Sequence, residues 1–163
     1  MALTKEIKEY IHRSVLCWLA TTSTENIPNV SPKEAFTYYG ANIIIANIAS
    51  PQTVQNIKQN ENVSLSFIDV LVQKGFQIKG KAEVIGKTHS EFTEMEKILS
   101  EMTRGKFQFA TITKIDIRQV KPIIAPSYIL YPETTENDQI ESSKRAYGIK
   151  KLTHNKKYSA FGR

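Results

Sequence analysis

Residues 43–67 read IIIANIASPQTVQNIKQNENVSLSF and carry strand, helix and strand signals in close succession. The first four residues form a short apolar run, which predicts a buried strand over 43–47. Ser50 and Pro51 then begin a predicted helix, because serine caps a helix N-terminus and proline suits the first helical position. We expect this helix to end near Asn60 and the alternating residues 63–70 to form the next strand.

Outward from this segment, short runs with period-2 alternation dominate. Further strands are predicted at 15–22, 27–38, 74–85 and 107–120, helices at 3–13 and 88–103, and a polar loop at 133–141. Thr4 is the expected cap of the first helix. The prolines of 27–38 indicate an edge or interrupted strand, and Gly80 indicates a bulge or a close approach. The inner face of the helix after Ser50 is expected to hold Val54, Ile57 and Lys58.

The connections between these elements are short, which favours antiparallel hairpins over βαβ units. The sequence therefore predicts an α+β fold, built on a small antiparallel β-barrel with a few flanking helices. A chain of 163 residues has room for one domain. We place that domain at 1–143 and a basic tail at 144–163.

The positive charge is concentrated in the tail. The chain has 22 Lys and Arg residues and 16 Asp and Glu residues. Seven of the basic residues and none of the acidic ones fall in 144–163. Residues 1–143 therefore contain 15 basic and 16 acidic residues. A nearly neutral body does not favour a nucleic-acid-binding domain. The tail is either a solvated extension or a contact for an anionic partner, and salt-sensitive binding lost on deleting 144–163 would indicate the second.

Several chemistries lack their usual residues. His12, His89 and His154 are far apart and no CxxC or HxxH pair exists, so no metal site is expected. Cys17 is the only cysteine and lies in an apolar strand, which indicates a core residue rather than a catalytic thiol. Phosphate-loop, dinucleotide and GxSxG motifs are absent. No apolar run could cross a membrane and no secretory signal begins the chain, so we expect a cytoplasmic protein.

One group of residues does suggest a ligand. Ser50, Gln52 and Thr53 stand at the start of a predicted helix, where unpaired N–H groups and the helix dipole attract a phosphate. Lys33, on a neighbouring strand, could add a cation. The alternative is an ordinary helix cap that binds no ligand.

Four segments, PNVSPK (28–33), IIIANIASPQT (43–53), NIKQNENVSLSF (56–67) and GKAEV (80–84), together resemble the pyridoxamine 5′-phosphate oxidase-like family of FMN-binding split β-barrels. The resemblance rests on their joint order and spacing, and extends from Val15 to about Val120. It implies a split β-barrel that binds FMN non-covalently at a homodimer interface. It further implies an oxidoreductase whose flavin acts on a small-molecule redox substrate.

The resemblance also implies which residues bind FMN. The isoalloxazine would face the strand backbone of Pro28, Asn29, Val30 and Ser31, with Lys33 reaching the cofactor. The ring and ribityl chain would lie beside Ile45, Ala46 and Asn47. The phosphate would be held by Ser50, Pro51, Gln52 and Thr53.

The chain departs from the true oxidases of the family, which have an arginine where Pro28 stands and an Arg-Lys pair where Pro51-Gln52 stands. Each charged hydrogen bond left unreplaced costs about 1.5–3 kcal/mol, for which Ser31, Lys33 and Thr53 would partly compensate. The oxidases also carry a C-terminal tryptophan and an Arg-x-His motif, which the ending KKYSAFGR lacks. Pyridoxine 5′-phosphate oxidation is therefore not the expected activity, and predicted flavin-nucleotide-binding relatives with PNVSPK-like strands are the better match.

The segment APSYILYPE (125–133) allows two interpretations. Tyr128 could pack on the flavin of a partner chain, or Tyr128 and Tyr131 could simply pack on the barrel surface. For the whole protein, the alternative to an oxidoreductase is a non-enzymatic binder of flavin, haem or F420 on the same barrel. No general acid or base is identified, so no catalytic residue is assigned.

Overall fold

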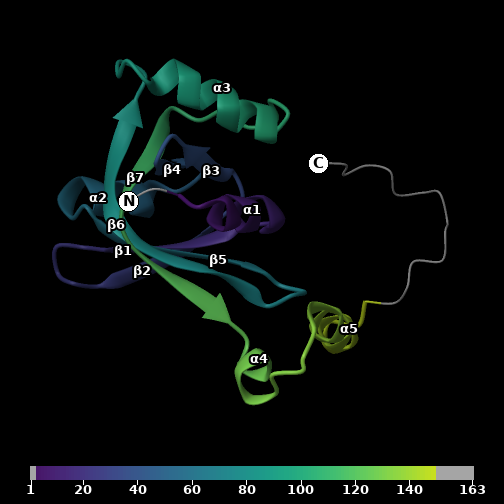
Figure 1. Ribbon diagram of the computed structural model, residues 1–163. Coiled ribbons are helices and arrows are strands. Elements are labelled where there is room, and N and C mark those ends of the chain that lie inside the picture. Colours follow the sequence, from purple (N-terminus) through teal and green to yellow (C-terminus); the bar gives the residue numbers. More distant parts are fainter. Residues whose placement is uncertain (1–2, 150–163) are drawn as a thin grey trace.

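The structure is a computed structural model that describes residues 3–149. Within these residues, seven strands form one antiparallel sheet in the order β2-β1-β5-β6-β7-β4-β3. The strands are β1 (Cys17–Thr22), β2 (Pro28–Lys33), β3 (Phe36–Tyr39), β4 (Asn42–Ala46), β5 (Asn62–Asp69), β6 (Lys74–Gly86) and β7 (Thr111–Ile124). The sheet curls into a partly open barrel (Figure 1), which confirms the predicted antiparallel split β-barrel of the α+β class.

Five helices flank this sheet in the described part of the chain: α1 (Lys5–Arg13), α2 (Pro51–Gln59), α3 (Phe92–Met102), α4 (Pro126–Leu130) and α5 (Glu136–Ala146). Helix α3 covers one end of the barrel, whereas α4 and α5 lie at the opposite end (Figure 1). Thr4 caps α1 as predicted, since its hydroxyl accepts a hydrogen bond from the Ile7 N–H at 3.2 Å.

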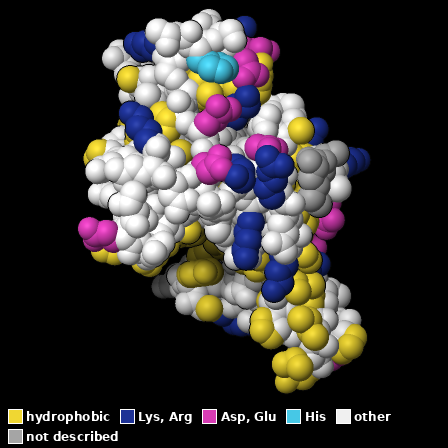
Figure 2. Space-filling view, turned by 90° about the vertical axis from the view of Figure 1, so that its left-hand side faces the viewer, with side chains coloured by type: hydrophobic (Ala, Val, Ile, Leu, Met, Phe, Trp, Pro, Cys, Tyr) yellow, Lys and Arg dark blue, Asp and Glu magenta, His cyan; other side chains and the backbone are white. Residues whose placement is uncertain are grey.

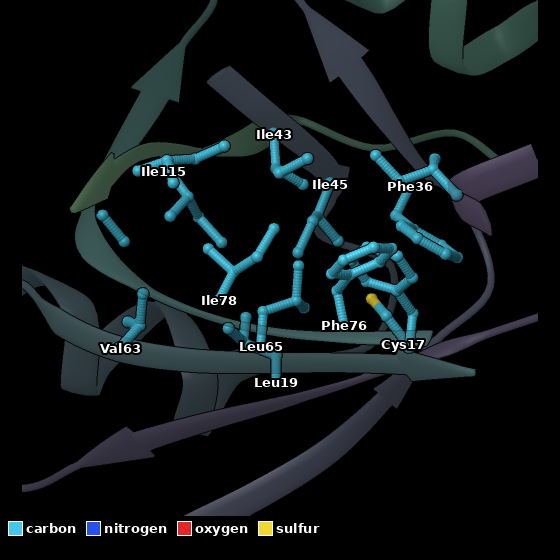
Figure 3. Close-up of a cluster of buried hydrophobic side chains, with 14 of the residues drawn as sticks. Cys17, Leu19, Phe36, Ile43, Ile45, Val63, Leu65, Phe76, Ile78 and Ile115 are labelled. Atoms are coloured by element: carbon cyan, nitrogen blue, oxygen red, sulfur yellow. The ribbon is translucent and has the colours of Figure 1, made fainter. Parts of the chain in front are cut away.

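Strand β4 is buried on both faces, as its apolar run predicts. Ile43 and Ile45 point into the main core, where they meet residues such as Leu65 and Ile78 (Figure 3). The alternate residues Ile44 and Ala46 belong to a second core beneath α3. Because β4 separates two cores, it fixes the position of the turn that follows it and leads into α2.

Strand β1 differs from the expectation of a buried strand at 15–22. Cys17 and Leu19 are fully buried, but Trp18 between them is 48% exposed. The reason is that only the concave face of the curled sheet is filled by the main core, so alternate side chains of β1 lie on the outer face. Trp18 therefore lies on the surface beside Pro32 of β2.

Other strands and helices begin or end at different residues than the sequence predicts. The expected strand at 27–38 is divided into β2 and β3, and the final strand runs over 111–124 rather than 107–120. Most of the expected polar loop at 133–141 is instead helix α5, which a reciprocal capping box between Thr135 and Asp138 stabilises. The predicted boundary between residues 143 and 144 falls inside α5. The basic residues of 150–163, together with His154, lie outside the described residues.

Gly80 is the site of the predicted irregularity. The β6–β7 register shifts between Lys79 and Gly80. A Cβ at Gly80 would lie 2.4 Å from the Asp116 carbonyl oxygen. The close approach that the glycine permits is therefore to the neighbouring strand of the same chain.

Candidate cofactor-binding site

Lys33 is a buried cation at the end of β2. Its side chain points inward and the residue is only 5% exposed. Its Nζ donates to the Ser50 hydroxyl and lies 3.5 Å from the Thr53 hydroxyl oxygen. Burial lowers the pKa of the Lys33 ammonium below its usual range. The fold thus places a positive charge directly behind the first turn of α2.

Cys17 is the cross-strand neighbour of Lys33. The thiol is completely buried, and burial raises its pKa well above the ordinary value. A neutral thiol is a poor nucleophile. The structure thus confirms Cys17 as a core residue.

The first turn of α2 differs from a simple capped helix. Ser50 makes no capping hydrogen bond; its hydroxyl donates to the Ile48 carbonyl oxygen at 2.9 Å and accepts from Lys33. The expectation that Ser50 caps the helix is therefore wrong, because its side chain is turned toward the lysine. Pro51 has no N–H, so the first free helix donors are the N–H groups of Gln52 and Thr53. These donors suit an anion.

An amide and hydroxyl network surrounds this turn. Asn47 donates to the Thr111 hydroxyl at 3.1 Å and accepts from Thr113 at 2.9 Å. Gln52 donates to Asn56 at 2.8 Å, and buried Asn56 donates to Thr21 at 3.0 Å. The sequence predicts Asn47 and Gln52 as site residues but does not predict their hydrogen-bond partners. The only signal in the sequence is Asn56, a polar residue four positions after Gln52 on the buried side of the helix.

A hollow of about 370 Å³ adjoins the start of α2. It is lined by Asn47, Ser50, Pro51, Val54, Gln55, Lys58 and Thr111. Lys58 is exposed, so its expected place on the inner face is wrong; that face holds Thr53, Asn56 and Ile57. Lys58 follows Pro51 by seven residues and Val54 by four, so these three residues lie on the same side of the helix. Lys58, in the last turn of α2, is therefore a second cation at the hollow, about 10 Å along the helix from its start.

The predicted residues of β2 lie along an edge of the sheet. Pro28 and Val30 are exposed, while Asn29 and Ser31 are partly buried. Asn29 is held by a 3.4 Å contact from its amide nitrogen to the Thr21 hydroxyl. An edge strand has one free side of backbone, so β2 can offer N–H and C=O groups to a flat ring.

The predicted residues of β4 can contribute only backbone atoms. Ile45 and Ala46 are buried in the two cores, and only Asn47, just after the strand, has its side chain at the hollow. The structure thus brings Lys33, Asn47, Ser50, Gln52 and Thr53 together.

Tyr128 is not part of this group within one chain. Its hydroxyl donates to the Val72 carbonyl oxygen at 2.8 Å, and the Lys74 ammonium lies 4.3 Å from its ring centre. Helix α4, which carries Tyr128, is well separated from α2 in Figure 1. Tyr128 therefore packs on its own chain at the far end of the β5–β6 hairpin.

The described residues contain no cluster of three His, Cys, Asp or Glu side chains placed to hold a metal ion. Likewise, none of the helices between residues 3 and 149 is long and apolar enough to span a membrane.

Comparison with known proteins places the chain in a family. The family profile of pyridoxamine 5′-phosphate oxidase matches residues 3–124, which is most of the chain. The protein therefore belongs to the pyridoxamine 5′-phosphate oxidase family, as the sequence resemblance predicted. No curated protein sequence matches it significantly.

Solved structures share the fold at low sequence identity. An FMN-binding protein from Syntrophomonas wolfei is 16% identical with a TM-score of 0.63, and the alignment covers 74% of this chain and 86% of that one. The haem storage protein HutZ from Vibrio cholerae is 18% identical with a TM-score of 0.58, over 76% and 95%. An F420 reductase is 17% identical with a TM-score of 0.57, over 73% and 98%. At these identities the likeness shows the fold alone.

Proposed function

We propose that this protein is a cytoplasmic flavoprotein that binds FMN non-covalently. The phosphate lies at the start of α2, the ring lies against β2, and the site is completed at an interface between two copies of the chain. The carrying observation is the buried Lys33 ammonium, which contacts the Ser50 and Thr53 hydroxyls behind the helix start.

The residues present suit a phosphate group. Gln52 and Thr53 provide backbone N–H donors, and Ser50 provides a hydroxyl beside them. Lys33 provides charge from behind the turn, and Lys58 adds a more distant cation at the same hollow. The true oxidases have the Arg-Lys pair at the turn itself. We expect weaker phosphate binding than in those oxidases, because Pro51 and Gln52 are neutral.

When bound, the isoalloxazine would supply the redox chemistry toward a small-molecule substrate. The protein's own residues would bind and orient it: β2 offers backbone groups at a sheet edge, and Asn47 offers an amide fixed by Thr111 and Thr113. No acid or base is needed for these roles. The only tryptophan is Trp18, so the C-terminal tryptophan of pyridoxine 5′-phosphate oxidases has no counterpart.

Haem is the second candidate, on one observation: a haem storage protein shares the fold. A haem site needs an axial ligand, usually histidine. Of the described histidines, His12 lies on α1 and His89 precedes α3, and neither lines the hollow beside α2. The geometry therefore favours FMN.

The test is an absorbance spectrum of the purified protein, followed by heat release and identification of the chromophore. A flavin spectrum with FMN released near one per chain supports the proposal. A haem or deazaflavin spectrum would replace FMN by one of the alternatives. A colourless protein that also fails to take up added FMN would contradict it.

A further inference from the structure

The C-terminal arm, residues 125–149, lies beyond the family match and exposes an apolar surface. Helix α4 within it contains no buried residue. Ile129, Leu130 and Tyr131 are each between 59% and 68% exposed. An isolated five-residue helix is not stable in water. Residues 3–149 therefore leave these apolar side chains uncovered.

The arm is nevertheless held firmly on its own barrel. Tyr128 bonds to Val72 on one side of α4, and Ser127 donates to Gln139 of α5 at 2.7 Å. Glu136, at the start of α5, pairs with Lys74 of β6 at 2.9 Å. The arm is thus pre-organised, with its apolar residues directed away from these contacts.

The outer face of the sheet is a second unpartnered surface of matching chemistry. One row across it consists of Pro32, Trp18, Ser66, Gln77 and Lys121, and the next of Val30, Ala20, Ser64, Lys79 and Gln119. The β2–β1 side is apolar and the β6–β7 side is cationic. Among the residues that the structure describes, Lys79 and Lys121 have no ion-pair partner, and Glu133 of the arm has none either.

The two surfaces are continuous. Ile68 stands two residues after Ser66 on β5, and it lines a hollow of about 290 Å³ together with Ile123 of β7 and Tyr147 at the end of α5. Figure 2 shows hydrophobic side chains gathered over the lowest part of the molecule, which is α4, and a recess between it and the barrel. The hollow therefore adjoins both the arm and the sheet face that carries Trp18.

We infer that the arm docks on the outer sheet face of a second copy of this chain. Ile129, Leu130 and Tyr131 cover the partner copy's Trp18–Val30 region, and Glu133 faces its Lys79 and Lys121 side. In an isologous dimer each copy gives one arm and receives one. This inference rests on the proposed function, and it places the arm over the strand against which we propose the flavin ring lies.

The docking has to bridge several strands of the partner copy's sheet. Trp18 and Lys121 are three strands apart, about 14 Å at the usual strand spacing. Four extended residues would span about 13 Å, but the step from Ile129 to Glu133 is shorter, because the Tyr131 N–H bonds to the Ser127 carbonyl oxygen and the Thr134 N–H to the Tyr131 carbonyl oxygen. Glu133 therefore meets the ends of the long lysine side chains rather than the strands that carry them.

The first test uses the double variant Ile129→Ser, Leu130→Ser in sedimentation experiments over a concentration series. Both side chains are exposed, so the circular dichroism spectrum stays unchanged, while the dimer dissociation constant rises at least about tenfold. Met102→Ser is the control, since Met102 is also an exposed apolar residue, 47% exposed, and lies on α3 at the other end. A wild-type protein that is monomeric throughout, or a double variant that dimerises like the wild type, overturns the inference.

A charge-swap experiment identifies the contact. Chains carrying Glu133→Lys dimerise poorly, and so do chains carrying Lys79→Glu with Lys121→Glu, because like charges then meet in both copies. Mixing the two chains restores a heterodimer in which every such contact is again of opposite sign. Absence of rescue contradicts the docking.

FMN uptake by the same samples separates the two proposals. If the wild-type protein binds FMN but the arm variants dimerise as strongly as the wild type, only the docking is overturned. A dimer that weakens as expected in a protein that takes up no FMN would overturn only the cofactor.

Discussion

Lys33 is the residue on which the candidate site depends. A buried ammonium is costly unless it is bonded, yet its two contacts in the chain are neutral hydroxyls of Ser50 and Thr53. An anion at the helix start would compensate this charge. Removing the charge of Lys33 should therefore affect the stability of the free protein and its affinity for a phosphate differently.

Lys33→Met should weaken FMN binding by roughly 10- to 100-fold, corresponding to a lost charged hydrogen bond. Isothermal titration with FMN measures this. Lys5→Met, an exposed change on α1, is the control and should leave the affinity unaltered. Equal affinities in Lys33→Met and the wild type would place the phosphate elsewhere.

The lowered pKa of Lys33 predicts opposite pH trends. As pH rises through that pKa, the ammonium loses its charge and FMN affinity falls earlier than for an ordinary lysine near 10.5. Between the lowered pKa and 10.5 the unfolded chain binds more protons, so this group makes the free protein more stable as pH rises. FMN titrations and urea unfolding at several pH values measure both trends. In Lys33→Arg, which stays charged, neither should appear.

Gly80→Ala should destabilise the protein by about 1–3 kcal/mol, because the added Cβ would collide with the Asp116 backbone. Urea unfolding measures the loss. Gly86→Ala is the matched control on the same strand, where a Cβ meets nothing within 4 Å. Similar losses in the two variants would mean that the close approach is relieved in solution.

At the scale of elements, Asp69 joins α1 to the β5–β6 hairpin. Its carboxylate accepts from Arg13 Nε at 2.9 Å and from the N–H groups of Leu71 and Val72. One side chain thus fixes both the end of α1 and the turn that precedes β6. The C-terminal arm depends on the same hairpin, because Tyr128 and Glu136 contact Val72 and Lys74 there.

Asp69→Ala should cost about 1–3 kcal/mol of unfolding free energy, since it leaves backbone donors and a half-buried arginine unpaired. Asp116→Ala, which removes an exposed ion pair with Arg118, should cost less than about 1 kcal/mol. Chemical denaturation compares the two. Equal costs would show that the hairpin does not depend on Asp69.

At the scale of the whole molecule, a ligand that binds only the folded protein stabilises it by mass action. FMN at about 100 times its dissociation constant adds about 2.7 kcal/mol, which raises the melting temperature by roughly 5–10 °C for a domain of this size. Riboflavin, which lacks the phosphate, should raise it much less at the same concentration. Scanning fluorimetry or calorimetry measures both shifts, and an equal effect of the two compounds would argue against a phosphate site at α2.

Local patterns were sufficient for most elements and for the fold class. The apolar run of β4, the Ser-Pro start of α2 and the alternation of β5 and β6 are properties of neighbouring residues, and the structure places these elements within a residue or two of their predicted bounds. Helix α5 is not predicted, because its polar sequence has little apolar periodicity and its main signal is the Thr135–Asp138 capping box. The family resemblance supplied the cofactor, which composition and spacing alone did not.

The tertiary structure decided which side chains meet and which faces stay open. Lys33 reaches Ser50 and Thr53 because the curled sheet brings β2 beside α2, and Lys58 lines the hollow although its sequence position suggested the core. The tertiary structure also decides that Trp18 lies on the outer face of the sheet and that Tyr128 bonds to the β5–β6 hairpin of its own chain. Residue patterns fix local conformation through short-range sterics and burial, whereas contacts between distant segments depend on how the sheet closes.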